Sequence, residues 1–133
     1  MGAPMPGAGQ ARSFKLLIVD DSNIMRRRIE RSQQYEQLQV VGTAANGIEA
    51  IELFSKTDPD VVTMDITMPH MDGIECIEKL VSMKPSIRIL VISALADKAT
   101  AVEAMEKGAN GFLNKPFTDR QLNDAIAELV RSG

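Results

Sequence analysis

Apolar residues are concentrated in five short runs along the chain. The runs cover residues 15–20, 38–44, 60–65, 87–93 and 111–114. Three of them are continuously apolar rather than alternating with polar residues, which is typical of strands that are buried on both faces of a parallel sheet. The pattern therefore predicts five strands in a parallel sheet that is covered by helices.

The stretches between these runs carry apolar residues at helical spacing. We expect helices over residues 23–34, 47–56, 73–83, 100–108 and 118–132. Ile48, Ile51 and Phe54 illustrate the spacing and are expected to face the core. Gly108 is suited to end the fourth helix, and Thr118 or Asp119 can cap the fifth. Strands and helices thus alternate from one end of the chain to the other.

Five alternating strand–helix units predict an α/β fold of the (βα)5 type. The units are too few for an eight-stranded barrel, so we expect a doubly wound open parallel sheet with right-handed crossovers and strand order 2-1-3-4-5. Ligands bind such sheets at the carboxyl ends of the strands, where the strand order reverses. The predicted site therefore lies between the first and third strands.

Three of the apolar runs end on a side chain that carries a reactive oxygen. The first run ends at Asp20 and Asp21, the third at Asp65 and the fourth at Ser93. Lys115 follows the fifth run. Because the carboxyl ends of parallel strands lie at one edge of the sheet, we expect these side chains to converge at the predicted site.

Three carboxylates in one crevice repel each other and remain ionised together only with a compensating cation. A hard divalent ion such as Mg²⁺ prefers oxygen ligands, and Lys115 adds a fixed positive charge. Acids, a metal, a lysine and a hydroxyl are suited to phosphoryl transfer, in which catalysis is mainly positioning and charge neutralisation. One carboxylate would act as the nucleophile and form an acyl phosphate.

Composition narrows the class of protein. The 133 residues carry a net charge of -3, which argues against broad nucleic-acid binding. The run Arg26–Arg28 is typical of a solvated helix face.

Residues 1–13 are Gly/Pro-rich and predict a disordered tail, so the folded domain covers 14–133. No apolar run is long enough to span a membrane. A single cysteine, Cys76, cannot form an internal disulfide, which favours a reducing cytoplasm. We also expect a monomer.

Two other classes of protein share parts of this pattern. A flavodoxin-like electron carrier would bind flavin phosphate in the loop after the first strand, but Asp20 and Asp21 would repel it. A phosphatase of the haloacid-dehalogenase type needs a second aspartate two residues after the nucleophile, where this chain has Thr67.

Four segments resemble a known family in order and spacing. They are "VDDS" (19–22), "MDITMPHMDG" (64–73), "ISA" (92–94) and "KGANGFLNKPF" (107–117). From about residue 14 onward, the chain resembles the receiver domain of bacterial two-component response regulators, and most closely the single-domain chemotaxis regulators. This resemblance implies the flavodoxin-like receiver fold.

The resemblance also implies roles for individual residues. Asp65 would be the phosphoacceptor. Mg²⁺ would be bound by Asp21, Asp65 and the backbone carbonyl of Thr67, with Asp20 acting partly through water. Lys115 would contact the phosphoryl group through a loop that contains a cis Lys115–Pro116 bond.

The same resemblance implies a switch and partners. Ser93 would hydrogen-bond the phosphoryl group, and Phe112 matches the switch aromatic without a hydroxyl. A histidine kinase would donate the phosphoryl group, and the chain would catalyse only its own phosphorylation and dephosphorylation. Output would be protein binding, either to a flagellar motor switch component or, in a phosphorelay, to a histidine phosphotransfer protein. The partner face would comprise Ala96, Lys98, Ala101, Phe112, Asn114, Phe117 and Thr118.

The lifetime of the phosphorylated form depends on residues that border the attacking water. By the resemblance these are Thr67 and Leu95, and neither is a strong general base. We therefore expect slow self-hydrolysis and a separate phosphatase.

Overall fold

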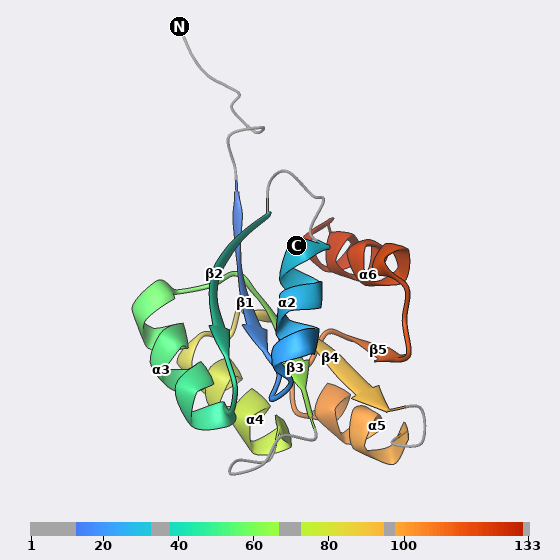
Figure 1. Ribbon diagram of the computed structural model, residues 1–133. Helices are drawn as coiled ribbons and strands as arrows, with labels where there is room; N and C mark the ends of the chain where they lie inside the picture. Colours follow the sequence, from blue (N-terminus) through green and yellow to red (C-terminus); the bar gives the residue numbers. More distant parts are fainter. Residues whose placement is uncertain (1–12, 33–37, 67–72, 95–97, 132–133) are drawn as a thin grey trace, which may run out of the picture.

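The computed structural model describes residues 13–32, 38–66, 73–94 and 98–131. Its strands are β1 (Phe14–Val19), β2 (Leu38–Ala44), β3 (Val61–Asp65), β4 (Arg88–Ala94) and β5 (Gly111–Lys115). Its helices are α2 (Asn23–Arg31), α3 (Gly47–Thr57), α4 (Gly73–Met83), α5 (Lys98–Glu106) and α6 (Asp119–Arg131). Figure 1 shows each strand followed by a helix, so the alternation predicted from the sequence is confirmed.

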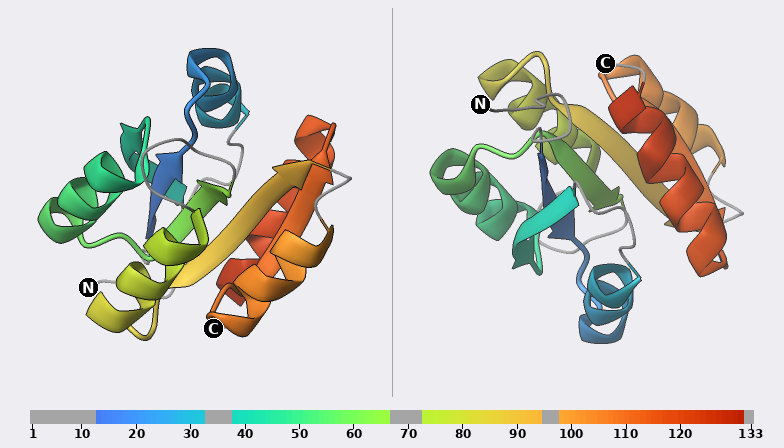
Figure 2. Two further views of the ribbon diagram at one scale, coloured as in Figure 1. Left: turned by 90° about the horizontal axis from the view of Figure 1, so that it is seen from below. Right: turned by 90° about the horizontal axis from the view of Figure 1, so that it is seen from above.

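All strand pairs are parallel, and the strand order is β2-β1-β3-β4-β5. This confirms the predicted doubly wound sheet. The two views in Figure 2 show helices on both faces of the sheet. Helices α3, α4 and α5 cover one face, and α2 and α6 cover the other.

Successive residues of the central strands point into two separate cores. In β1, Leu17 and Val19 pack with α3 and α4, whereas Leu16 and Ile18 pack with α2 and α6. This alternation follows from the two-residue period of a strand. Burial on both faces explains why the central strands read as continuous apolar runs. Among the described helices, none combines the length and apolar character needed to cross a membrane.

The buried face of α3 departs from the predicted spacing. In α3, Ala50 and Phe54 are buried, but Ile48 is 61% exposed. The core-facing position of the first turn is taken by Gly47, and the next residue lies about 100° away around the helix. The expectation that Ile48 faces the core was therefore wrong.

The beginning of α6 confirms one of the two predicted caps. The hydroxyl of Thr118 accepts the backbone N–H of Gln121 at 3.0 Å, and the side chain of Gln121 accepts the N–H of Thr118 at 2.8 Å. This reciprocal pair is a capping box, which satisfies two of the free N–H groups at a helix start.

Gly73 brings the beginning of α4 against the end of β3. A Cβ atom at this position would lie 2.4 Å from the Cα of Ile66, the residue after Asp65. That is far inside ordinary contact, and the obstructing atoms are largely backbone. A glycine at 73 is therefore needed for the present position of the chain next to Asp65.

Replacing this glycine should destabilise the fold. We expect Gly73→Ala to lower the free energy of unfolding by about 1–3 kcal/mol, because the backbone of Ile66 must shift. Gly42→Ala is the matched control, since its Cβ would meet only side chains at 3.5 Å or beyond, and alanine is favoured over glycine in a strand by about 0.5 kcal/mol. Urea unfolding of both variants checks this, and equal midpoints would contradict it.

Candidate functional site

Three carboxylates meet at the carboxyl ends of β1 and β3. Asp20 and Asp21 follow β1, and Asp65 is the last residue of β3, which pairs directly with β1. One oxygen of each carboxylate lies within 4.8 Å of the other two. Asp20 and Asp65 are buried, with 1% and 2% exposure, whereas Asp21 is exposed. The structure thus brings together the acids that the sequence placed at the switch point.

Lys115 reaches this cluster from the end of β5. Its Nζ lies 3.9 Å from Oδ2 of Asp20 and 3.8 Å from Oδ2 of Asp65. These separations are ionic contacts that are longer than a hydrogen bond. The Lys115–Pro116 peptide bond is cis, as the resemblance implies.

Ser93 supplies a buried hydroxyl on the neighbouring strand. It follows Ile92, which is paired with Asp65, and is 1% exposed. Its Oγ accepts a hydrogen bond from the side-chain amide of Asn114 at 3.3 Å. Asn114 lies directly opposite Ser93 in the pairing of β4 with β5. A polar contact therefore connects the site to the strand that carries Phe112 and Lys115.

The electrostatics of the cluster are most visible at Asp20. Burial, together with the nearby charges of Asp65 and Asp21, raises the pKa of its carboxyl from 3.8 to about 6. The backbone N–H of Ser22 and the charge of Lys115 act against this rise in pKa. Oδ1 accepts that N–H at 2.8 Å. Oδ2 is buried and has no hydrogen bond within the described part of the chain.

These residues fit a hard divalent cation. The donor set is made of carboxylate oxygens alone, which Mg²⁺ prefers. One of these oxygens is buried without a hydrogen bond among the described residues. Burial beside two other acids raises the pKa of Asp20, so a cation at this site would stabilise the ionised cluster. Thr67, whose carbonyl was predicted as a further ligand, lies outside the described residues, as does Leu95.

The structure divides the predicted partner face. Lys98 and Thr118 are exposed, Phe112 is 50% exposed, and Asn114 is partly buried. Lys98, Phe112 and Asn114 line a hollow of about 440 Å³ between α5 and β5. Ala96 lies outside the described residues.

Two members of the predicted partner face are not surface residues. Ala101 is 1% exposed, because it faces the sheet from α5. Phe117 is 5% exposed and packs into the core between the sheet and α6. Ala101 nevertheless lines the hollow between α5 and β5, whereas Phe117 is covered, and the role of both residues in partner binding stays a prediction.

Sequence analysis also missed two arginines. Arg26 donates to the backbone carbonyl of Asp20 at 2.6 Å, and Arg28 donates to the backbone carbonyl of Phe117. Treating Arg26–Arg28 as a solvated face was therefore wrong for the first and third residues. Arg26 and Arg28 are two positions apart, so they lie about 200° apart around the helix. This angle was the sequence feature that indicated different neighbours for the two side chains.

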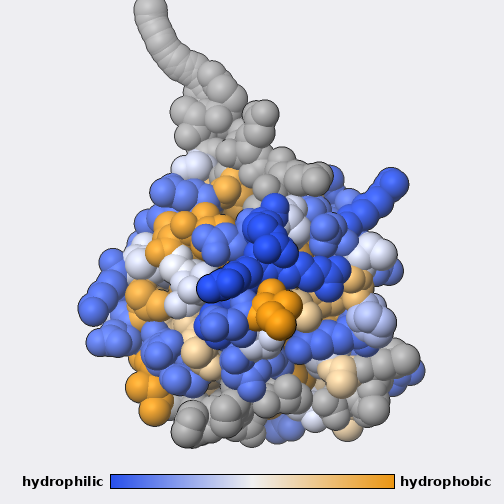
Figure 3. Space-filling model, in the orientation of Figure 1, coloured by the Kyte–Doolittle hydropathy of each residue, from blue (hydrophilic) through white to orange (hydrophobic). Residues whose placement is uncertain are grey.

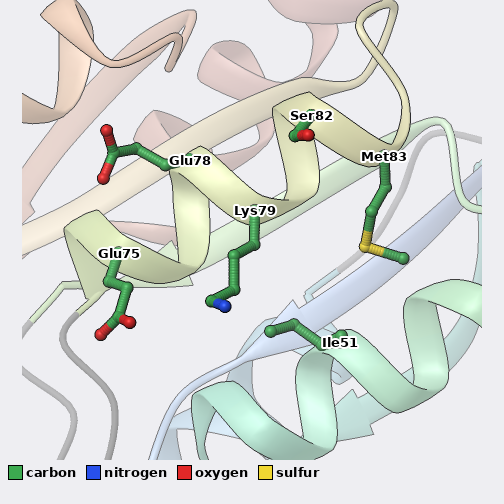
Figure 4. A pocket seen from close by; sticks show the side chains of 6 residues that line it. All are labelled: Ile51, Glu75, Glu78, Lys79, Ser82 and Met83. Atoms are coloured by element: carbon green, nitrogen blue, oxygen red, sulfur yellow. The ribbon is translucent and has the colours of Figure 1, made fainter.

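A separate groove lies between α3 and α4. Its volume is about 560 Å³, and it is lined by Ile51, Glu75, Glu78, Lys79, Ser82 and Met83 (Figure 4). None of the clustered acids, Ser93 or Lys115 lines this groove. The chemistry of the chain is therefore assigned to the strand ends.

A doubly wound sheet with acids, a lysine and a hydroxyl at its switch point defines a class of protein, and comparison identifies the family. Residues 16–127 match the family model of the response regulator receiver domain. The chain therefore belongs to the response regulator receiver domain family.

Known relatives include both short and long proteins. The chemotaxis protein CheY of Listeria monocytogenes is 38% identical over 118 residues, which cover 89% of this chain and 99% of that protein. A protein-glutamate methylesterase/protein-glutamine glutaminase of Pseudoalteromonas atlantica is 46% identical, but the match covers 88% of this chain and only 32% of that protein.

Solved structures agree with the family. The CheX–CheY–BeF3–Mg²⁺ complex from Borrelia burgdorferi contains a chain that is 31% identical with a TM-score of 0.84, and the match covers 92% of each chain. The response regulator domain of Thermotoga maritima CheB is 37% identical with a TM-score of 0.76, and the match covers 91% of this chain and 96% of that one.

The raised pKa of Asp20 predicts a pH-dependent instability of the metal-free protein. A folded-state pKa of about 6 exceeds the ordinary value of 3.8, so the penalty is fully present above pH 6, decreases as the pH falls from 6 to 3.8 and is lost below 3.8. Asparagine keeps the Oδ1 acceptor and removes the charge. We expect Asp20→Asn to stabilise the protein by about 1–2 kcal/mol at pH 7.5 in EDTA, and by less at pH 5.

Urea unfolding at both pH values measures this gain. The exposed Asp124 gives the matched control, because Asp124→Asn removes a charge without relieving burial. A wild-type protein as stable at pH 7.5 as Asp20→Asn would contradict the expected penalty.

Proposed function

We propose that this receiver domain is a phosphorylation-switched signalling protein in which Asp65 accepts a phosphoryl group from a histidine kinase. The observation that carries the proposal is the buried carboxylate of Asp65 at the end of β3, within 4.8 Å of Asp20 and Asp21 and 3.8 Å from Lys115 Nζ. Carboxylates of this kind act as nucleophiles when the surrounding charge is balanced.

The chain's own residues supply the nucleophile and the positioning. A carboxylate oxygen of Asp65 bonds to phosphorus as the bond from phosphorus to the donor histidine nitrogen breaks, and that nitrogen keeps the electron pair. Asp20, Asp21 and Asp65 would hold Mg²⁺, which supplies neutralisation of the charge on the phosphoryl oxygens. Lys115 would pair with a phosphoryl oxygen, because its Nζ already lies beside Asp65.

Ser93 connects this chemistry to the protein surface. Its hydroxyl accepts the amide N–H of Asn114 in the present structure. When a phosphoryl oxygen is present, the hydroxyl donates to it while still accepting from Asn114, so a shift of Ser93 toward the phosphoryl group also moves Asn114. Asn114 lines the same hollow as Phe112 and Lys98. Phe112 has no hydroxyl, so its response is a change in ring packing.

Output by protein binding follows from these surface residues. The chain matches nearly the full length of CheY relatives, which supports a cytoplasmic chemotaxis regulator that binds a flagellar motor switch component. Similarity to the methylesterase relatives keeps other regulatory roles open, and a phosphorelay intermediate that passes its phosphoryl group to a histidine phosphotransfer protein is the second candidate.

Removing the nucleophile tests the proposed chemistry. Asp65→Asn should abolish labelling by acetyl phosphate or a phosphorylated histidine kinase in the presence of Mg²⁺, because an amide is not a comparable nucleophile. Labelled protein is measured on a gel that separates phosphorylated from unphosphorylated forms. Asp124→Asn, which changes an exposed acid on α6, should be labelled like the wild type. Wild-type labelling of Asp65→Asn would sink the proposal.

The partner face is tested by binding with and without phosphorylation. Two purified baits are used, a flagellar motor switch component and a histidine phosphotransfer protein. We expect phosphorylation to increase binding to one of them, and Phe112→Ala to reduce that binding at least about tenfold. Ile48→Ala is the control, because Ile48 is equally apolar and exposed but lies on α3. If neither bait responds to phosphorylation, both candidate outputs are wrong.

A further inference from the structure

The helix α2 carries three consecutive arginines, Arg26, Arg27 and Arg28. It lies on the side of the molecule seen in Figure 3, where hydrophilic side chains surround a small apolar patch. We propose that Arg26 and Arg28 are positioning residues that fix the two oppositely charged loops of the phosphorylation site relative to each other. Arg27, between them, has no such role. The inference rests on the proposed function and assigns a positioning role in phosphorylation to Arg26 and Arg28.

Arg26 holds the acidic loop. Its Nη1 donates to the backbone carbonyl of Asp20 at 2.6 Å, and its Nη2 donates to the side chain of Asn23. The carbonyl of Asp20 belongs to the peptide that joins Asp20 to Asp21. Anchoring this carbonyl therefore restricts the peptide from which both carboxylates project.

Arg28 holds the loop that carries the lysine. Its Nη2 donates to the backbone carbonyl of Phe117, and its guanidinium carbon lies 4.6 Å from the centre of the Phe117 ring. Its Nε is 3.3 Å from the carboxylate of Asp119. Phe117 comes two residues after Lys115, so the clamp lies close to the base of the lysine side chain.

The strengths of these contacts differ. The Arg28–Asp119 pair is largely exposed, with 58% exposure of the Asp119 side chain, and exposed ion pairs contribute little. The charged hydrogen bond to the Phe117 carbonyl and the stacking on a buried ring are stronger contacts. The fork of an arginine can make both at once, which lysine cannot.

Lys115 needs such external support. Its separations of 3.8 and 3.9 Å from the carboxylates are ionic contacts rather than hydrogen bonds, so they do not fix the direction of the side chain. Arg26 and Arg28 lie on the same turn of α2, which is rigid over so short a distance. The helix therefore holds the two loops at a fixed distance from each other. Arg27 is exposed and makes no hydrogen bond or ion pair among the residues that the structure describes.

The experiment compares alanine variants at the three arginines, with acetyl phosphate as donor so that kinase docking plays no part. Magnesium binding is measured by calorimetry, and the phosphorylation rate is measured at saturating Mg²⁺. Arg27→Ala removes the same charge from the same helix and is the control.

Each positioning residue should give its own result relative to Arg27→Ala. Arg26→Ala should weaken Mg²⁺ binding about fivefold, because the peptide between the metal-binding carboxylates is released. Arg28→Ala should leave Mg²⁺ affinity unchanged or tighter and slow phosphorylation about tenfold, because a misplaced group near the reacting atoms has effects of this order or larger. Arg28→Lys should not restore the rate.

Thermal unfolding of all variants separates positioning from stability. The inference is overturned if the losses of Mg²⁺ affinity and of phosphorylation rate both scale with the fall in Tm. It is also overturned if Arg26→Ala and Arg28→Ala match Arg27→Ala in Mg²⁺ affinity and in rate. Phe117→Leu removes the aromatic ring but keeps the backbone carbonyl that accepts from Arg28, so it should slow phosphorylation less than Arg28→Ala. This second variant keeps the role of Arg28 testable even if Arg28→Ala is unstable. If wild-type protein takes no label, the proposed function fails, and Mg²⁺ affinity of Arg26→Ala still decides the inference.

Discussion

The repulsion between three carboxylates is the constraint on which the rest of the site depends. Their oxygens lie within 4.8 Å of one another, and two of the side chains are buried. Water cannot screen charges in such a crevice as it does at an exposed surface. The site therefore needs positive charge at fixed places. Lys115 lowers the pKa of Asp20, but burial and the two other acids outweigh this effect, so the ionised cluster is stabilised further when a cation binds.

The fold holds this unfavourable cluster together through its two cores. Residues of β1 and β3 pack against α3 and α4 on one face and against α2 and α6 on the other, so the strand ends cannot separate to relieve the repulsion. Gly73 brings the start of α4 against Ile66, immediately after Asp65, the proposed nucleophile. Rigid packing beneath a charged rim is a common way to preorganise a site, because the packed core supplies the free energy that the charges oppose.

Sequence alone predicted the features that follow from topology. Parallel strands that alternate with helices fix the strand order, and acids that end the first and third strands must then meet at the switch point. It could not predict side-chain directions that depend on contacts distant in the chain. The resemblance placed Phe117 on the partner face, but its ring packs into the core between the sheet and α6 and lies beside Arg28, 89 residues away. Ile48 fitted a helical spacing, but α3 packs against the sheet through the face that contains Gly47 and Ala50, and Ile48 lies outside that face. Roles for Thr67, Leu95 and Ala96 stay predictions, because these residues lie outside the described part of the chain.

The same buried charge explains how a local reaction can reach a protein surface. Ser93 lies next to Ile92, which pairs with Asp65, and its hydroxyl can serve one principal partner as donor. In the present structure that hydroxyl accepts from Asn114 across the β4–β5 ladder. A phosphoryl oxygen on Asp65 would be a stronger acceptor than any neutral group nearby, so it would fix the orientation of this hydroxyl, which can still accept from Asn114. A shift of Ser93 toward the phosphoryl oxygen would then also move Asn114, which lines the hollow that contains Phe112 and Lys98. Under the proposed function, charge added at Asp65 would thereby change the packing of a surface that another protein can bind.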